Sequence, residues 1–109
     1  MLKKVKKTWG EEHWYVNNEL YCSKLLIVNQ NQWSSKGKYH YHKKKDETFY
    51  ILNGTLLLDL EGSIIPLKKG ESIRIKPNEK HKFTSKTKTC KFLEVSTHHE
   101  DSDSFRVKK

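Results

Sequence analysis

Breaks by glycine, proline and asparagine constrain the fold of this chain more than any other sequence feature. They recur about every eight to twelve residues and separate short apolar runs, a spacing typical of all-β sandwiches and barrels. No segment shows convincing helical periodicity. The runs are YCSKLLIV (21–28), ETFYIL (47–52), TLLLDL (55–60), SIIPL (63–67), SIRI (72–75), HKFT (81–84) and KFLEVS (91–96). We therefore predict an all-β fold with roughly seven to nine short strands, a sandwich or small barrel.

The turn residues also predict how some strands connect. Asn53-Gly54 lies between two apolar runs, and both positions tolerate positive φ, so this dipeptide predicts a hairpin turn. Glu61-Gly62, Lys69-Gly70 and Pro77-Asn78 predict further turns. These four breaks divide the middle of the chain into closely spaced strands.

The length of 109 residues suits one domain, because a second core would have too little chain to close around it. We expect a ragged basic arm over residues 1–8, a barrel over 9–97 and a polar tail over 98–109. There is no run of about 18 apolar residues and no secretory signal, so we expect a cytoplasmic protein with no membrane contact. Cys22 and Cys90 are expected to be buried thiols, with a disulfide as the alternative.

The net charge of +9 raises the possibility of nucleic-acid binding. However, 20 of the 22 basic residues are lysine and are scattered along the chain, whereas base reading and bidentate phosphate contacts favour arginine. We therefore expect a solvated basic surface and no nucleic-acid partner. The charge remains compatible with acidic or phosphorylated small molecules.

A metal site is predicted by the stretch KYHYHKKKDETFYILNG (38–54). Residues i and i+2 of a strand share a face about 7 Å apart, so His40 and His42 point the same way. Glu47 begins the next run and His81 begins HKFT, each at the head of an apolar strand face. Imidazole and carboxylate ligands suit one divalent transition metal (Fe, Mn, Ni, Co, Cu or Zn), with open positions for water or substrate. A single strand histidine is more often structural, so the prediction rests on the set.

Other histidines are expected to play structural roles. Adjacent residues on an extended chain point to opposite sides, so His98 and His99 are expected to lie in an exposed polar tail without chelating together. His13 has no partner at ligand spacing.

The pattern His40-x-His42-x4-Glu47-x6-Gly54, followed by Gly70, Pro77 and His81, resembles the two signatures of the cupin superfamily. This resemblance implies a double-stranded β-helix, the cupin or jelly-roll barrel. Over nearly the entire chain, the sequence also resembles the cupin domain of type II mannose-6-phosphate isomerases, with metal ligands at the positions of His40, His42, Glu47 and His81. It departs by a longer loop before Glu47, by lacking a glutamine ahead of the first histidine, and by lacking the nucleotidyltransferase domain often attached to that cupin.

The resemblance implies a sugar or sugar-phosphate isomerase with the metal as Lewis acid. Such a reaction needs a base near the carbon acid, and Glu94 is the candidate because it shares a strand face with Phe92 and Ser96. Its alternative is an outward carboxylate paired with a lysine. Lys24, on a face with Leu26, and Arg106 could contact a phosphate or form structural ion pairs.

Two other functions remain open at this point. Three histidines and a glutamate also suit an iron dioxygenase, and the lack of a convincing base suits a non-catalytic module that binds a sugar or other small ligand. Barrels of this kind commonly pair through N-terminal strands, so a homodimer is expected, with the strand at 21–28 as the candidate for exchange.

Overall fold

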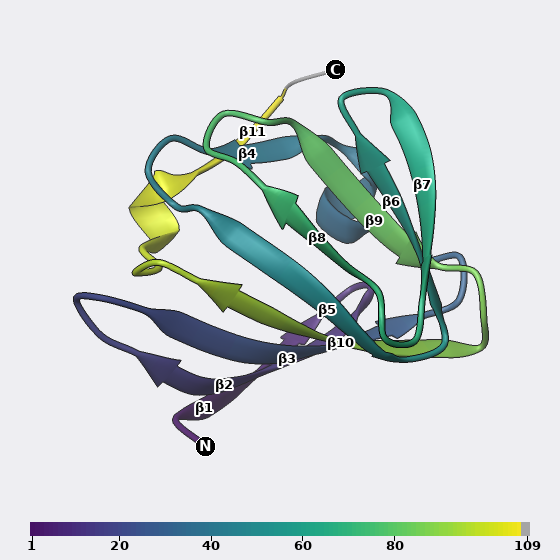
Figure 1. Ribbon diagram of the computed structural model, residues 1–109, viewed down its shortest axis with the longest axis horizontal. Coiled ribbons are helices and arrows are strands. Elements are labelled where there is room, and N and C mark those ends of the chain that lie inside the picture. Colours follow the sequence, from purple (N-terminus) through teal and green to yellow (C-terminus); the bar gives the residue numbers. More distant parts are fainter. Residues whose placement is uncertain (108–109) are drawn as a thin grey trace.

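The computed structural model describes residues 1–107, which form two antiparallel sheets that face each other (Figure 1). One sheet has the order β1-β2-β3-β10-β5-β8 and the other β11-β4-β9-β6-β7. Lys108 and Lys109 of the expected tail lie outside the described residues. The strands of the first sheet are β1 (Lys3–Lys7), β2 (Gly10–Asn17), β3 (Cys22–Asn29), β10 (Thr89–Ser96), β5 (Glu47–Asn53) and β8 (Ser72–Ile75). Those of the second are β11 (Ser104–Arg106), β4 (His40–His42), β9 (His81–Ser85), β6 (Thr55–Leu60) and β7 (Ser63–Lys68).

The all-β prediction is confirmed, and the helical segments within residues 1–107 are two short 3₁₀ turns, η1 (Ser34–Gly37) and η2 (Asp101–Asp103). Neither is long and apolar enough to cross a membrane. In Figure 1 the sheets converge where β5 passes into β6 and separate at the opposite end, where η2 lies. The hydrophobic core occupies one part of the space between the sheets, and the candidate site occupies another.

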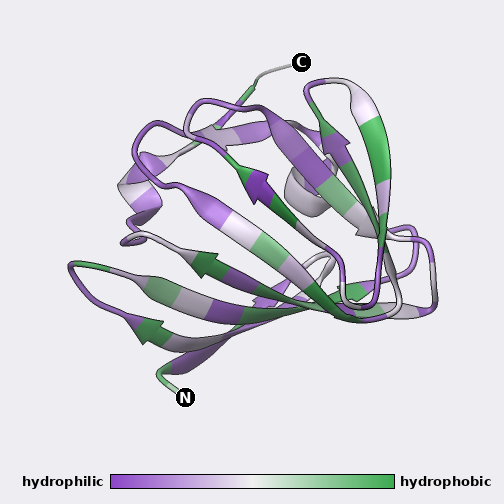
Figure 2. Ribbon diagram, viewed as in Figure 1, coloured by the Kyte–Doolittle hydropathy of each residue, from purple (hydrophilic) through white to green (hydrophobic). Residues whose placement is uncertain are grey.

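Alternating burial builds the core. In β3 every second residue from Cys22 to Val28 is buried, and in β10 every second residue from Cys90 to Ser96 is buried. Figure 2 shows that hydrophobic and hydrophilic residues are interspersed along the strands, and the buried set of these two strands includes the charged residues Lys24 and Glu94. Phe49 and Phe92 meet with ring centres 4.6 Å apart, and Phe83 packs edge-on against both rings. Cys22 and Cys90 are buried free thiols, as expected.

The predicted hairpin at Asn53-Gly54 is wrong. β5 pairs with β10 and β8, whereas β6 pairs with β7 and β9, so the chain crosses here from one sheet to the other. Of Asn53 and Gly54, only Gly54 has positive φ (79°). A tight two-residue turn of type I′ needs positive φ at both positions. Glu61 and Gly62 both have positive φ, and they do close a hairpin, between β6 and β7.

The two ends of the described chain are more ordered than expected. Lys3–Lys7 form edge strand β1 along β2 rather than a ragged arm. A polar edge strand has no buried face, so it carries no hydrophobic alternation to reveal it. At the other end, Ser104–Arg106 form β11, which pairs with β4. These additions bring the strand count within residues 1–107 to eleven.

Candidate functional site

A cavity of about 760 Å³ lies between the sheets and is lined by residues of both. Phe49 and Phe83 belong to its lining and also to the hydrophobic core, so the cavity begins where the core ends. Its polar lining comes from strands of both sheets, from η1 and from the C-terminal segment that follows β10. The polar lining residues that the site uses include Lys24, His40, His42, Lys45, Glu47, Glu94 and His99.

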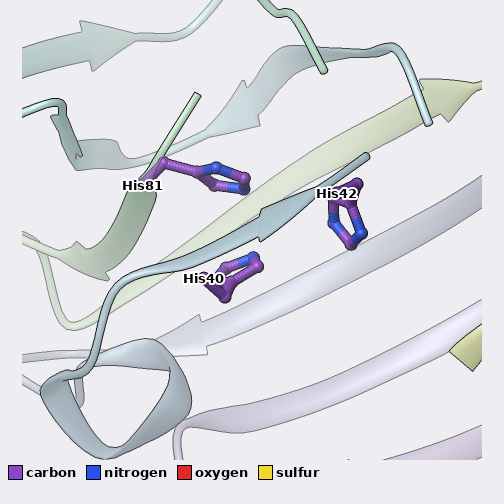
Figure 3. A group of neighbouring side chains, drawn as sticks. All are labelled: His40, His42 and His81. Atoms are coloured by element: carbon purple, nitrogen blue, oxygen red, sulfur yellow. The ribbon is translucent and has the colours of Figure 1, made fainter. Parts of the chain in front are cut away.

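Three histidines form a cluster beside this cavity, and two of them, His40 and His42, line it. His40 and His42 extend from the same face of β4, and His81 comes from β9, where it is the register partner of His40 (Figure 3). One ring nitrogen from each histidine lies within 4.8 Å of the others. His81 is fully buried and His42 nearly so. The alternation predicted for residues 40–42 therefore directs both rings to one point.

Hydrogen bonds orient two of these rings. His42 Nδ1 lies 3.0 Å from the carbonyl oxygen of Asp103, and His81 Nδ1 lies 3.0 Å from that of Glu79. Each Nδ1–H therefore donates to a backbone carbonyl, which leaves the Nε2 atom of each ring free on the side that faces Glu47. Outer-shell bonds of this kind fix the orientation of metal-binding histidines.

Glu47 completes the group. Its Oε2 lies 3.5 Å from His42 Nε2 and 3.3 Å from His81 Nε2. Glu47 Oε2, His81 Nε2 and His40 Nδ1 are buried, and no other residue described here forms a hydrogen bond with them. Ligands about 2.0–2.2 Å from one ion, at angles of about 90–110°, lie about 3.0–3.5 Å apart. Glu47 Oε2 thus lies at ligand spacing from His42 and His81, and the donor types suit one divalent transition metal.

Burial keeps the imidazoles of His40 and His42 in the form that binds metals. Burial lowers the pKa of His40 well below its ordinary value, and the neighbouring His81 and His42 lower it further. The pKa of His42 is lowered mainly by burial and then by Lys45, against the opposing effect of Glu47. A neutral imidazole can offer its lone pair to a cation without first losing a proton.

Lys45 was not among the site residues predicted from the sequence. Its ammonium is buried and lies 2.8 Å from Glu94 Oε2 and 3.7 Å from Glu47 Oε1. Burial lowers the pKa of Lys45, but Glu94 and Glu47 outweigh burial and raise it above its ordinary value. A signal was present, because Lys45 stands two residues before Glu47 and residues i and i+2 of an extended chain share a face.

Glu94 faces the cavity, so the alternative that it points outward is wrong. Burial raises the pKa of this carboxyl, but Lys45 and then Lys24 outweigh burial, and the net pKa lies well below its ordinary value. A carboxylate with a lowered pKa is a weak base. Glu94 therefore stands in the right place for a base but in an unfavourable electrostatic setting.

His99 extends the charged network toward solvent. Its Nδ1 accepts a hydrogen bond from Lys45 Nζ (3.1 Å), and its Nε2–H donates to Asp101 Oδ1 (2.9 Å). Burial lowers the pKa of His99, and Lys45 lowers it further. His98 instead bonds the carbonyl oxygen of Asn18, 2.7 Å away. The two histidines thus point apart, as expected, but His99 joins the cavity rather than an exposed tail.

Asp103 connects the C-terminal segment to the site. Its carboxylate accepts hydrogen bonds from the backbone N–H groups of Lys43, Lys44 and Lys45, at 3.0–3.2 Å. Its carbonyl oxygen accepts the bond from His42 described above. A single residue of η2 therefore holds both the turn that presents Lys45 and the ring of His42.

Lys24 and Arg106 both line the cavity, at different depths. Lys24 is buried, with its ammonium 3.9 Å from Glu12 Oε1 and 3.9 Å from the centre of the Trp14 ring. Both contacts exceed hydrogen-bond length. Arg106 is exposed on β11, opposite His40 in the register with β4. Lys24 thus lies within the lining, whereas Arg106 lies at the surface beside the histidines.

Comparison with known proteins gives a family match over most of the barrel. The model of the cupin domain matches residues 24–96. The uncharacterized protein MJ1618 of Methanocaldococcus jannaschii is 33% identical over 75 residues, which cover 63% of this chain and 58% of that protein. The match thus spans a little over half of the relative's length. The matched range contains all three histidines, Glu47 and Glu94, but not Asp103.

Solved structures show the same fold at low identity. Pac13 from Streptomyces, described as a nucleoside dehydratase, has a TM-score of 0.83 at 12% identity, over 97% of this chain and 84% of that one. A putative sugar phosphate isomerase from Acidithiobacillus ferrooxidans has a TM-score of 0.64 at 20% identity, over 73% and 51%. These likenesses confirm the predicted double-stranded β-helix.

Proposed function

Because this chain belongs to the cupin family, we propose that it holds one divalent transition metal and acts as an isomerase of a small sugar or sugar phosphate. The proposed metal ligands are His40, His42, Glu47 and His81. The observation that carries the proposal is the set of three buried polar atoms, on His40, Glu47 and His81, that converge without hydrogen-bond partners. Such atoms are costly unless a cation is present between them.

The chemistry needs a charge-stabilising group and a base. Aldose–ketose interconversion breaks a C–H bond beside a carbonyl, moves that electron pair into a C=C bond, and leaves the charge on the carbonyl oxygen. The proton of the neighbouring hydroxyl group then moves onto that oxygen, a C=O bond forms at the carbon that lost its hydrogen, and the former carbonyl carbon takes up a proton. A bound divalent ion would supply a Lewis acid beside these two oxygens. In this proposal Glu94 takes the proton, and Lys24 and Arg106 bind the phosphate.

The charge of the cavity supports an anionic small molecule as the substrate. Eight lysine and arginine side chains line the cavity against four carboxylates. An excess of positive charge in a concave site attracts phosphorylated or acidic ligands. Pac13 has been solved with uridine, and another structural neighbour is described as a putative sugar phosphate isomerase. We extend this class of small hydroxylated ligand to the present chain, with no nucleic-acid partner and a cytoplasmic location.

Ligand binding without turnover is the second candidate function. It is favoured by the contact between Glu94 and Lys45, which lowers the pKa of the carboxyl that would have to accept a proton. A module of this kind would hold the same metal and the same anionic ligand. It would be stabilised by the ligand without converting it.

Elemental analysis of the untagged protein tests the metal. We expect close to one equivalent of a transition metal, lost in His42→Ala and retained in His98→Ala, a partly exposed histidine outside the cluster. The same preparations are then assayed with mannose 6-phosphate for turnover, thermal stabilisation and oxygen uptake. No metal in the wild type after incubation with Fe, Mn, Ni and Zn would contradict the proposal. Stabilisation without turnover would select the binding module, and oxygen uptake would select a dioxygenase.

A further inference from the structure

Lys45 has one hydrogen-bond donor to spare. An ammonium carries three N–H donors, and Lys45 uses two of them, toward Glu94 Oε2 at 2.8 Å and His99 Nδ1 at 3.1 Å. Glu47 Oε1, at 3.7 Å, is beyond hydrogen-bond length. Within residues 1–107 no other group accepts a hydrogen bond from this ammonium, which is 97% buried, since its residue exposure is 3%.

The spare donor is close to the metal ligands. Lys45 lines the cavity beside Glu47, whose second oxygen faces His42 and His81. The two oxygens of one carboxylate thus face the ammonium and the imidazoles respectively. A ligand atom in the cavity next to the metal position is therefore within reach of the lysine as well.

We propose that Lys45 contacts the substrate and donates a hydrogen bond to the oxygen that becomes negative when the neighbouring C–H bond breaks. This inference rests on the proposed metal site and specifies the substrate as a molecule with two adjacent oxygens, of the α-hydroxy carbonyl class. One oxygen lies at the metal position and the other within reach of Lys45. A preorganised ammonium in a water-poor site stabilises developing negative charge strongly.

This role also explains why the ammonium is buried beside two carboxylates. Glu94 and Glu47 keep Lys45 charged and fix its position, so it need not be reorganised during the reaction. Glu94 then acts as a positioning residue for Lys45, whichever group takes the proton. The charge on the substrate oxygen appears as the C–H pair moves into the C=C bond, and it disappears when the proton of the neighbouring hydroxyl group moves onto that oxygen.

Oxalate is a suitable probe, because its two adjacent anionic oxygens imitate the charge-bearing O–C–C–O unit. Calorimetry on cobalt-loaded protein gives the dissociation constant, and the visible cobalt spectrum reports the metal site independently. Lys45→Met alone leaves Glu94 buried without a partner and could unfold the protein. The informative pair is therefore Glu94→Gln and the double variant Lys45→Met/Glu94→Gln, which differ only at Lys45.

We expect Glu94→Gln to bind oxalate at least as tightly as the wild type, and the double variant to bind at least tenfold more weakly with an unchanged cobalt spectrum. Lys44→Met, an exposed lysine of the same turn, controls for the loss of one charge and should leave the affinity unchanged. Equal affinity in Glu94→Gln and the double variant would overturn the role of Lys45 while leaving the metal site standing. A wild type that takes up no cobalt would overturn both proposals.

Discussion

Asp103 shows how much of the site depends on one residue far along the chain. Its buried carboxylate accepts hydrogen bonds from three consecutive backbone N–H groups, and its carbonyl oxygen orients His42. Burial raises the pKa of this carboxyl, but the N–H groups of Lys45, Lys44 and Lys43 outweigh burial, so the net pKa is lowered. A carboxyl pKa that is lower in the folded than in the unfolded state stabilises the fold at neutral pH, and this stabilisation is lost in acid.

We expect Asp103→Asn to lower the free energy of unfolding of the metal-free protein by about 1.5–3 kcal/mol at pH 7, the usual range for hydrogen bonds to a charged group. The stabilisation is fully present above the unfolded-state pKa of about 4. It disappears as the pH falls through the lower pKa of the folded state, because the wild-type carboxyl is then protonated too. Urea unfolding of both proteins at pH 7, 4 and 2.5 measures the difference, and a difference that does not shrink in acid would contradict this assignment.

The cluster of His40, His42, His81 and Glu47, the proposed metal site, could be predicted because its signal is local. His40 and His42 stand two residues apart on one strand, and Glu47 and His81 each head an apolar run, so strand alternation alone directs them inward. The same rule placed Glu94 on an inward face. Lys45 obeyed it too, but its place in a run of lysines concealed it.

His99 and Asp103 could not be predicted in this way. Their contacts with Lys45 and with residues 42–45 join positions more than 50 residues apart. The polar sequence of residues 98–104 has no periodicity that distinguishes a segment folded over a cavity from one in solvent. The pairing of β11 with β4 and the hydrogen bonds between Asn17 and His99 bring these residues to the site.

At the level of the elements, two glycine-containing turns that look alike in the sequence make different connections between strands. Glu61-Gly62 closes a hairpin within one sheet, whereas Gly54 carries the chain between sheets. A Cβ at Gly54 would lie 2.4 Å from the carbonyl oxygen of Thr89, while one at Gly62 would meet no atom within 4 Å. The sequence predicts that both are turns, but which strands they join depends on contacts with β10.

Gly54→Ala and Gly62→Ala form a matched pair that separates backbone strain from collision. Both positions have left-handed φ, 79° and 95°, so each alanine should cost on the order of 1 kcal/mol from φ alone. Gly54→Ala should cost on the order of 1–3 kcal/mol more, because the added Cβ would collide with the backbone carbonyl of Thr89. Thr89 lies in strand β10 and cannot move aside easily. Thermal or urea unfolding measures the difference. Equal losses would show that β10 yields at this corner.

On the scale of the whole molecule, the hydrophobic core and the cavity occupy different ends of the space between the two sheets. Where the sheets converge, aromatic and aliphatic side chains fill the interior; where they separate, charged side chains surround the cavity.

The outer face of the larger sheet also carries apolar groups, with Val95 51% and Tyr50 42% exposed. β3, the strand suggested for exchange between subunits, already pairs on both edges within the chain.

We still predict a homodimer, now through the outer face of the larger sheet rather than by exchange of β3. Apolar groups exposed on a sheet commonly mark an interface. Light scattering at micromolar concentration should give close to twice the chain mass of 13.0 kDa. Val95→Glu should shift the protein to the monomer without lowering its stability. A particle of 13 kDa for the wild type would contradict the prediction.

The return of the C-terminal segment to β4 also sets an order of events during synthesis. His40, His42 and Glu47 lie in the first half of the chain and leave the ribosome well before Asp103 and β11. Until then, the turn at Lys43–Lys45 has no carboxylate to hold it, and His42 has no carbonyl to orient its ring. A nascent chain released before residue 103 would carry most of the barrel's strands but an unfinished site. Metal uptake should therefore be a late event, after translation of the barrel is complete.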